Sequence, residues 1–183
     1  MSKIKNRVIT LLAAFILTAS AAIAAPALND QASYDARLAK QVRKELVTLP
    51  YYGVFDNLAF EVKGDTVVLS GQVTRPSTRK DAERRVAKIE GVERVVNNIQ
   101  VLPVSSFDDQ IRVRTYRAIF RSGSLYRYAM GANPSIHIVV NRGHVTLEGV
   151  VSSKMDSQLA YMAANGVPGV FSVKNNLRVE RGD

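Results

Sequence analysis

The sequence of 183 residues contains no cysteine and no tryptophan, and its only histidines are His137 and His144. Without cysteine the chain has no means of forming a disulfide framework, a thiolate metal site or a lipid-modified N-terminus. No third ligand is evident beside the two histidines, so we expect no metal and no cofactor. Acidic residues form no recurring pair and no glycine-rich phosphate loop is present, which predicts a protein that is not an enzyme and has no small-molecule substrate.

Long apolar runs are also missing, except near the N-terminus. There a basic head precedes a mostly apolar stretch at residues 8–17, and Ala22-Ile23-Ala24 supplies the small residues that a signal peptidase needs. We therefore expect residues 1–24 to be a signal peptide, cleaved before Ala25. An uncleaved membrane anchor is the alternative, but the apolar run is short for a membrane span.

Basic residues outnumber acidic ones. The formal net charge is +9, or +6 without the three basic residues of the signal segment. A basic surface favours anionic partners, either phospholipid head groups or nucleic acid, and export makes phospholipid the better candidate of the two. We expect no nucleic-acid partner.

Most of the remaining sequence consists of two copies of an internal repeat. An offset of 78 positions aligns residues 58–101 with 136–179 without a slip, and an offset of 73 aligns the preceding helical pattern, Asp35 to Leu46, with Asp108 to Ile119. The second copy has therefore gained five residues after its first helix. The matched residues include apolar, glycine and asparagine positions: Val62 with Val140, Leu69 with Leu147, Gly71 with Gly149, Ala82 with Ala160, Gly91 with Gly169, and Asn97 with Asn175.

Each copy has the same order of periodicities. Alternating apolar residues on either side of a turn, Gly64-Asp65 in the first copy and Asn141-Arg142-Gly143 in the second, predict a β-hairpin. A helical stripe follows, and a third apolar strand ends the copy. The fold class is α+β, with two tandem α-β-β-α-β modules, each a three-stranded sheet with two helices packed on one face. We expect a flexible lead at residues 25–33, a first module at 34–102, a linker at 103–106 and a second module at 107–181, with the two modules packed together.

The repeated glycines and asparagines are expected to have structural roles. Gly91 and Gly169 stand where the second helix of each copy should stop. Gly71 and Gly149 indicate a bulge or the close approach of a helix. The side-chain amides of Asn97 and Asn175 are expected to satisfy nearby backbone groups.

These features together resemble the BON domain, a family named for bacterial osmotically inducible and nodulation proteins. The residues that carry the resemblance are GDTVVLSGQV from Gly64 with GVERVVNN from Gly91, and RGHVTLEGVV from Arg142 with GVPGVFSVKNN from Gly166. The resemblance implies export to the periplasm of Gram-negative bacteria, phospholipid binding or protection of the envelope under osmotic or other stress, and no catalytic residues. Because cysteine is absent, we do not expect a lipoprotein.

The second copy differs from the first by an arginine row and by the inserted loop. Arg114, Arg117 and Arg121 are spaced to lie along one helix face, and the loop adds tyrosines and a further arginine. Arginines beside tyrosines are typical of a surface that contacts anionic lipid. The candidate lipid-binding residues are Arg114, Arg117, Arg121, Tyr126, Arg127 and Tyr128.

Two alternatives stay open. The arginines are equally compatible with an ordinary solvated face, in which Leu125, Tyr126, Tyr128 and Met130 pack under the loop or against the other module. The protein is also compatible with a different function, that of a protein-binding module, either a chaperone for exported proteins or a partner of an envelope complex. Exposed apolar side chains around Tyr126 and Met130 would favour this second function.

Overall fold

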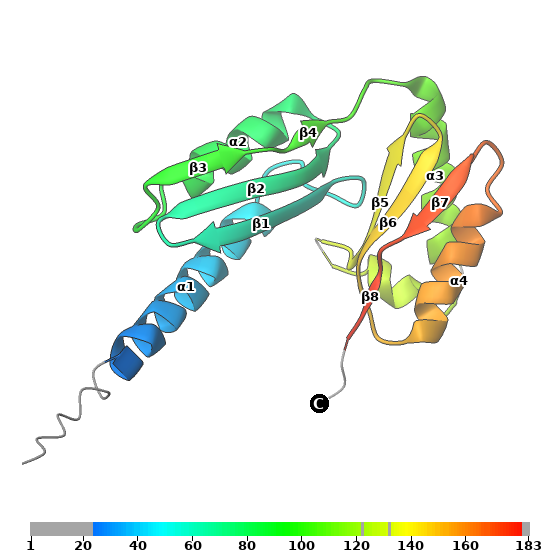
Figure 1. Ribbon diagram of the computed structural model, residues 1–183. Helices are drawn as coiled ribbons and strands as arrows, with labels where there is room; N and C mark the ends of the chain where they lie inside the picture. Colours follow the sequence, from blue (N-terminus) through cyan, green and yellow to red (C-terminus); the bar gives the residue numbers. More distant parts are fainter. Residues whose placement is uncertain (1–23, 122, 132, 181–183) are drawn as a thin grey trace, which may run out of the picture.

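The computed structural model describes residues 24–121, 123–131 and 133–180. The expected signal peptide lies outside these residues except for its last position. The chain forms two modules that lie side by side (Figure 1). The first contains α1 (Ala24–Val47), β1 (Asn57–Lys63), β2 (Thr66–Val73), α2 (Pro76–Val86), β3 (Arg94–Asn97) and β4 (Gln100–Val101). The second contains α3 (Ser106–Phe120), the 3-10 helix η1 (Tyr126–Ala129), β5 (Ile136–Asn141), β6 (His144–Val151), α4 (Lys154–Asn165), β7 (Ser172–Asn175) and β8 (Arg178–Val179).

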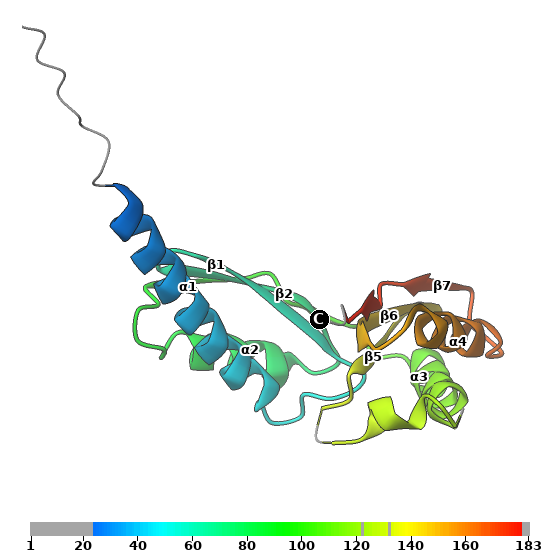
Figure 2. The ribbon, with the colours of Figure 1, turned by 90° about the horizontal axis from the view of Figure 1, so that it is seen from below.

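The two sheets have the same topology. In the first, β2 is central, with β1 antiparallel on one side and β3 and β4 parallel on the other. In the second, β6 lies between antiparallel β5 and parallel β7 and β8. Both helices of each module cover one face of its sheet (Figure 2). The predicted α+β fold with two tandem modules is therefore confirmed.

The third strand of each sheet is interrupted at the repeated asparagine pair. Asn97 accepts a hydrogen bond from the Ile99 N–H at 3.2 Å, and its amide nitrogen donates to the Arg79 carbonyl on α2 at 3.2 Å. Asn175 does the same in the second module, towards the Leu177 N–H and the Ser157 carbonyl. Each side chain therefore ties the break in the strand to the neighbouring helix, which is the backbone role that the sequence predicted.

The glycines after the second helices have a different role from the one expected. Helix α2 ends at Val86, and Gly91 lies five residues further on with φ of +90°. Likewise α4 ends at Asn165 and Gly169 has φ of +95°. These glycines therefore do not stop the helices; each provides a left-handed residue in the turn that leads to the third strand.

Gly71 and Gly149 allow a close approach, but of a strand and not of a helix. A Cβ atom on Gly71 would lie 2.1 Å from the carbonyl oxygen of Asn57, at the start of β1. On Gly149 it would lie 2.0 Å from the carbonyl oxygen of Ser135. Both glycines also have positive φ, at +113° and +118°. The backbone of the first strand of each sheet therefore occupies the space of a side chain.

The expected flexible lead is helical. Residues 25–33 belong to α1, which begins at Ala24. The segment is rich in alanine and contains no glycine, and its one proline, Pro26, lies in the first helical turn, where a missing N–H costs no intrahelical hydrogen bond. The prediction was wrong because the start of the helix was placed at the start of its apolar stripe, and the helix extends further towards the N-terminus than the stripe does.

Each module has its own apolar core, and the positions predicted from periodicity fill it. In the first, Leu38, Val42, Leu69, Ala82 and Val86 are buried together. In the second, the buried cluster includes Ile111, Ile119, Leu147, Ala160 and Ala164.

The modules meet through the loop that precedes β1. The Val54 carbonyl accepts a hydrogen bond from the Ile138 N–H at 2.7 Å. Phe55 packs against the core of the second module and meets the Tyr116 ring edge-on, with ring centroids 6.3 Å apart. His137 of β5 donates from Nδ1 to the Gly53 carbonyl at 3.2 Å. A loop of the first module therefore covers part of the edge strand of the second.

Candidate functional site

The arginine row of α3 lies on its outer face. Arg114, Arg117 and Arg121 are exposed, while Ile111, Thr115 and Ile119 of the same helix are buried. Arg114 donates to the Pro168 carbonyl at 3.3 Å and to Gln110. Among the described residues, the side chains of Arg117 and Arg121 have no hydrogen-bond or ion-pair partner, so both are available to an external anion.

The inserted loop divides into buried and exposed residues. Leu125 is fully buried in the second core, whereas Tyr126 is 61% exposed and Met130 is 65% exposed. Tyr126 and Met130 therefore do not pack under the loop, and Tyr126 stays in the candidate surface beside the C-terminal end of α3.

Tyr128 is not part of that surface, and Arg127 is exposed but already has an acidic partner. Tyr128 is only 7% exposed and donates from its hydroxyl to Asp156 at 2.9 Å. Arg127 forms an ion pair with the same carboxylate at 2.7 Å, and its guanidinium lies over the Tyr128 ring. The buried carboxylate of Asp156, which also accepts from the Ser153 hydroxyl, holds both side chains against the N-terminus of α4. Tyr128 is therefore withdrawn from the candidate surface, and the charge of the exposed Arg127 is already paired with Asp156.

The environment of Asp156 favours its charged form. The hydrogen bond from Ser153 lowers its pKa most, and those from Tyr128 and the charge of Arg127 act in the same direction, against the opposing effect of burial. The Tyr128 hydroxyl also accepts a hydrogen bond from the Ser152 N–H at 2.9 Å. In the first module the matching N–H, that of Thr74, donates to the buried carboxylate of Asp56 at 2.6 Å. Tyr128 thus serves the second copy in place of an aspartate.

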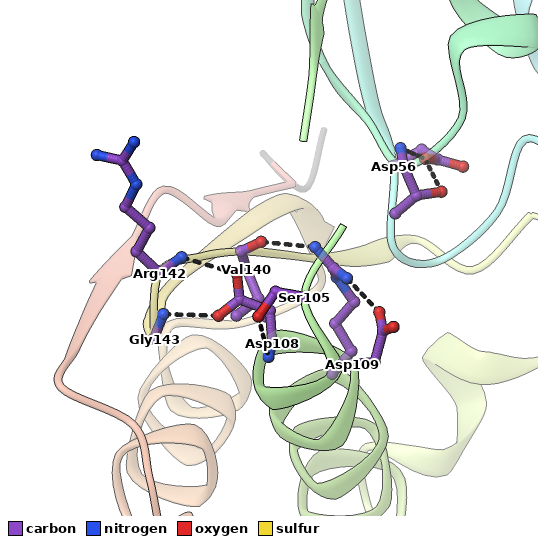
Figure 3. Close-up of polar contacts among 9 residues, drawn as sticks. Asp56, Ser105, Asp108, Asp109, Val140, Arg142 and Gly143 are labelled. Carbon is purple, nitrogen blue, oxygen red and sulfur yellow. Dashed lines mark hydrogen bonds and ion pairs between the residues drawn. The ribbon is translucent and has the colours of Figure 1, made fainter. Parts of the chain in front are cut away.

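A second polar cluster fixes the end of the second module (Figure 3). The buried Asp108 carboxylate accepts hydrogen bonds at 2.8 Å from the backbone N–H groups of Arg142 and Gly143 in the β5–β6 turn. Arg112, also buried, pairs with Asp109 and donates to the Val140 carbonyl at 2.8 Å. The N-terminus of α3 therefore holds the hairpin turn, and the Arg142 side chain points away from the cluster into solvent (Figure 3).

Exposed apolar side chains gather beside this turn. Phe171 is 68% exposed and its ring lies 5.9 Å from that of Phe107, which is itself 44% exposed. His144 meets the Phe171 ring edge-on, also at 5.9 Å. Val104, in the linker three residues before Phe107, is 99% exposed. We name Val104, Phe107 and Phe171, with Arg142, the aromatic end of the second module.

The first module has a different surface at the same place. The offset of 78 matches Phe171 to Glu93 and Pro168 to Glu90, and the offset of 73 matches Phe107 to Tyr34, which is half-buried and donates to the Gly91 carbonyl. The corresponding end of the first module therefore carries glutamates, with the exposed Arg94 beside Glu93, and the aromatic end is specific to the second copy. Periodicity does not reveal the aromatic end, because Phe107 and Phe171 lie 64 positions apart, in a helix and in the loop before β7. A comparison of the copies residue by residue would have found both substitutions.

The described part of the chain contains no cluster of three or more histidine, aspartate or glutamate residues that could hold a metal ion. None of its helices combines the length and the apolar character that a membrane span needs.

Comparison with known proteins gives one family. The model of the BON domain matches the chain twice, over residues 34–103 and 108–181. The search of curated proteins returned no match. Two solved structures of CdsD, a structural protein of the type III secretion system of Chlamydia trachomatis, are similar at a TM-score of 0.33. One, the C-terminal domain, has 11% identity and covers 79% of this chain and 98% of its own; the other has 10% identity and covers 80% and 94%. A likeness at this level carries no argument about the function of this chain.

Proposed function

The chain belongs to the BON domain family, which suggests an envelope-associated role, and on this premise we propose that it is an exported, non-enzymatic periplasmic protein that associates with anionic phospholipid and supports envelope integrity under stress. The second module makes the membrane contact. The aromatic end and the outer face of α3 together form the contact surface.

The observation that carries the proposal is the exposure of Phe171 and Phe107 beside exposed arginines. Large apolar side chains that gather on a surface usually mark an interaction site. Aromatic rings at the head-group level, flanked by arginine, are the side chains that lipid interfaces prefer. The acidic counterpart in the first module, Glu90 and Glu93, would be repelled by an anionic leaflet.

The arginines add an electrostatic attraction. Arg142 at the hairpin turn, with Arg117 and Arg121 on α3, can reach lipid phosphates without breaking an ion pair among the described residues. A basic residue close to an anionic leaflet contributes about 1 kcal/mol, so three of them matter when they act together. Arg127 does not belong to this set because Asp156 already neutralises it.

One observation favours a second function, that of a protein-binding module. The outer face of α4 exposes Met155, Tyr161 and Met162, whereas the matching positions of α2 are Ser77, Glu83 and Arg84. Methionine-rich faces adapt to varied apolar partners, as a chaperone or an adaptor in an envelope complex would require. Suppressed aggregation of a client protein in the absence of lipid would support this function.

Vesicle co-sedimentation of the mature chain tests the membrane proposal. We expect binding to vesicles that contain phosphatidylglycerol, a large loss of binding between 50 and 500 mM salt, and little binding to phosphatidylcholine alone. The double variant Arg117→Glu, Arg121→Glu should weaken binding at least tenfold, and Phe171→Ala should weaken it several-fold.

Lys80→Glu, on the exposed face of α2, is the matched control for each of the single variants Arg117→Glu and Arg121→Glu, because all three change the net charge by the same amount and Lys80 lies outside the proposed surface. Equal binding to neutral and anionic vesicles, or an equal effect of Lys80→Glu, would contradict the proposal.

A further inference from the structure

A groove of about 540 Å³ lies between the modules, away from the aromatic end. One wall comes from the C-terminal part of α1 and from β1 of the first module, and the other from β5, β6 and β8 of the second. Its volume is in the range of pockets that hold ligands. None of the residues of the proposed membrane contact lines this groove.

The strand β1 presents its edge to the groove. It is an outer strand of its sheet, and in the described residues no strand pairs with its other side. Residues 57–60 all line the groove. Because successive side chains of a strand point to opposite faces, four consecutive lining residues mean that the main chain faces the groove. The backbone of Leu58 already forms a hydrogen bond with the Tyr52 side chain, so the part of the edge that can pair with an added extended segment is the part around Phe60.

The equivalent edge of the second module already holds an occupant. Ile138 of β5 matches Phe60 of β1, and its N–H is bonded to the Val54 carbonyl of the other module. Phe55, next to Val54, anchors the contact against the Tyr116 ring. At this edge, the other module is therefore held by one main-chain hydrogen bond and by one neighbouring side chain, Phe55, which packs against α3.

The first module has different residues beside the edge of β1. The position of Tyr116 is taken by Arg43 of α1, which lines the groove. The second loop contributes Asn133, whose amide donates to the Val47 carbonyl at 2.7 Å and so closes only one end. Because Asn133 replaces Phe55, the second loop places no aromatic ring against α1; the groove is lined instead by Tyr52 of the first module's own loop, whose ring lies 5.5 Å from that of His137.

Two cations in the groove lack an acidic partner. Arg43 and Arg178 are exposed and make no hydrogen bond or ion pair with any residue that the structure describes. The one carboxylate in the lining, Glu148, is bonded by the Asn176 amide at 2.7 Å. The apolar part of the first wall is formed by Leu46, Leu58 and Phe60. The groove therefore combines an apolar wall and an open strand edge with two unneutralised positive charges.

We propose that this groove binds an extended peptide segment of a partner protein, which pairs with the edge of β1 and carries acidic side chains that meet Arg43 and Arg178. Main-chain pairing supplies affinity that depends little on sequence. The two arginines and the apolar wall select segments in which acidic and apolar residues alternate, because alternation sends the two kinds of side chain to opposite sides.

The test is selection of a phage-displayed library of random nine-residue peptides on the mature chain, without lipid. We expect enriched peptides that alternate acidic and apolar residues. A labelled enriched peptide should bind at least tenfold more weakly to Arg43→Glu and to Arg178→Glu. Lys40→Glu, an exposed cation of α1 outside the groove lining, should change the affinity less than twofold. Methylation of alternate backbone nitrogens of the peptide should abolish binding.

Each other outcome overturns the proposal. These outcomes are no enrichment, enrichment of peptides without acidic residues, an equal effect of Lys40→Glu, and full binding of the N-methylated peptide. If a soluble short-chain phosphatidylglycerol competes at this groove and no peptide does, the groove is a lipid site. Vesicle binding of Arg43→Glu is measured in parallel, so that loss of the peptide site is distinguished from failure of the membrane proposal.

Discussion

The backbone N–H of Ile138 donates a hydrogen bond to the carbonyl of Val54 across 2.7 Å and 84 positions of sequence. This bond joins the edge strand of the second module to a loop of the first. It places Phe55 against the second core and His137 against the first module. The two copies are therefore one packed unit, and the contact between them can be tested by mutation.

The Phe55 contact should couple the two modules. Phe55 is half-buried, so Phe55→Ala should lower the free energy of unfolding by about 1–3 kcal/mol, less than the truncation of a fully buried phenylalanine. A double-mutant cycle with Tyr116→Ala should give a coupling free energy of about 0.5–1.5 kcal/mol, since the rings meet edge-on. Urea unfolding measures both quantities. The control is Tyr51→Ala, on the same loop but exposed; an equal loss there would show that the loop matters without the ring contact.

The contact should also weaken in mild acid. Burial lowers the pKa of His137, and the hydrogen bond to Gly53 and the charges of Asp56 and Glu148 oppose this effect without reversing it. In the unfolded chain His137 takes up a proton near pH 6.5, whereas in the folded protein it does so only at a lower pH. The free energy of unfolding therefore falls as the pH drops below 6.5 towards the lowered pKa.

The measurement is the urea midpoint of unfolding between pH 7.5 and pH 5. We expect the midpoint of the parent chain to fall over this range and that of His137→Gln to fall less. His144→Gln is the control, because His144 is exposed and lies away from the contact between the modules. A parent midpoint that does not change with pH would refute the prediction.

The sequence predicted the modules well because duplication and periodicity are local signals repeated in two places. The stripe of Ala82 and Val86, and its copy at Ala160 and Ala164, are buried as expected. Hairpin turns were readable for the same reason: Gly64 and Gly143 each provide positive φ in a two-residue turn between antiparallel strands.

The remaining features depend on contacts that periodicity does not encode. Tyr128 has the sequence context of an exposed loop, yet its hydroxyl is buried against Asp156, a residue 28 positions away. Phe55 lies in a turn two residues after Gly53, and nothing in the sequence around it indicates a partner in the other module. Of the six candidate lipid-binding residues, Arg114, Arg117, Arg121 and Tyr126 are exposed and Tyr128 is buried, while Arg127 is exposed but forms an ion pair with Asp156. Lipid binding by the exposed residues stays a prediction.

Alanine at Gly149 should be severely destabilising. The added Cβ would lie 2.0 Å from the Ser135 carbonyl oxygen, and the backbone has φ of +118°, so either the first strand of the sheet moves or the ladder breaks. We expect a loss of at least about 2–3 kcal/mol in the free energy of unfolding. Gly53→Ala should change it by less than about 0.5 kcal/mol, because no atom lies within 4 Å of a Cβ there. Similar losses at both glycines would mean that the close approach of the strand is not the cause.

The cluster around Asp156 should contribute stability that acid removes. Its hydrogen bonds from Ser153 and Tyr128 and the charge of Arg127 hold its pKa below the ordinary value of 3.8, so the contribution is present above that pH and is lost as the pH falls through the lowered pKa. Asp156→Asn should therefore be less stable than the parent chain at pH 7, with a difference that narrows by pH 3, as measured by urea unfolding at both values. Tyr128→Phe leaves the Ser152 N–H without its acceptor and also removes a hydrogen bond to the Asp156 carboxylate, so it should cost about 1–3 kcal/mol at pH 7 and less at pH 3. A difference between Asp156→Asn and the parent that stays constant with pH would show that the carboxylate acts there only as a neutral acceptor.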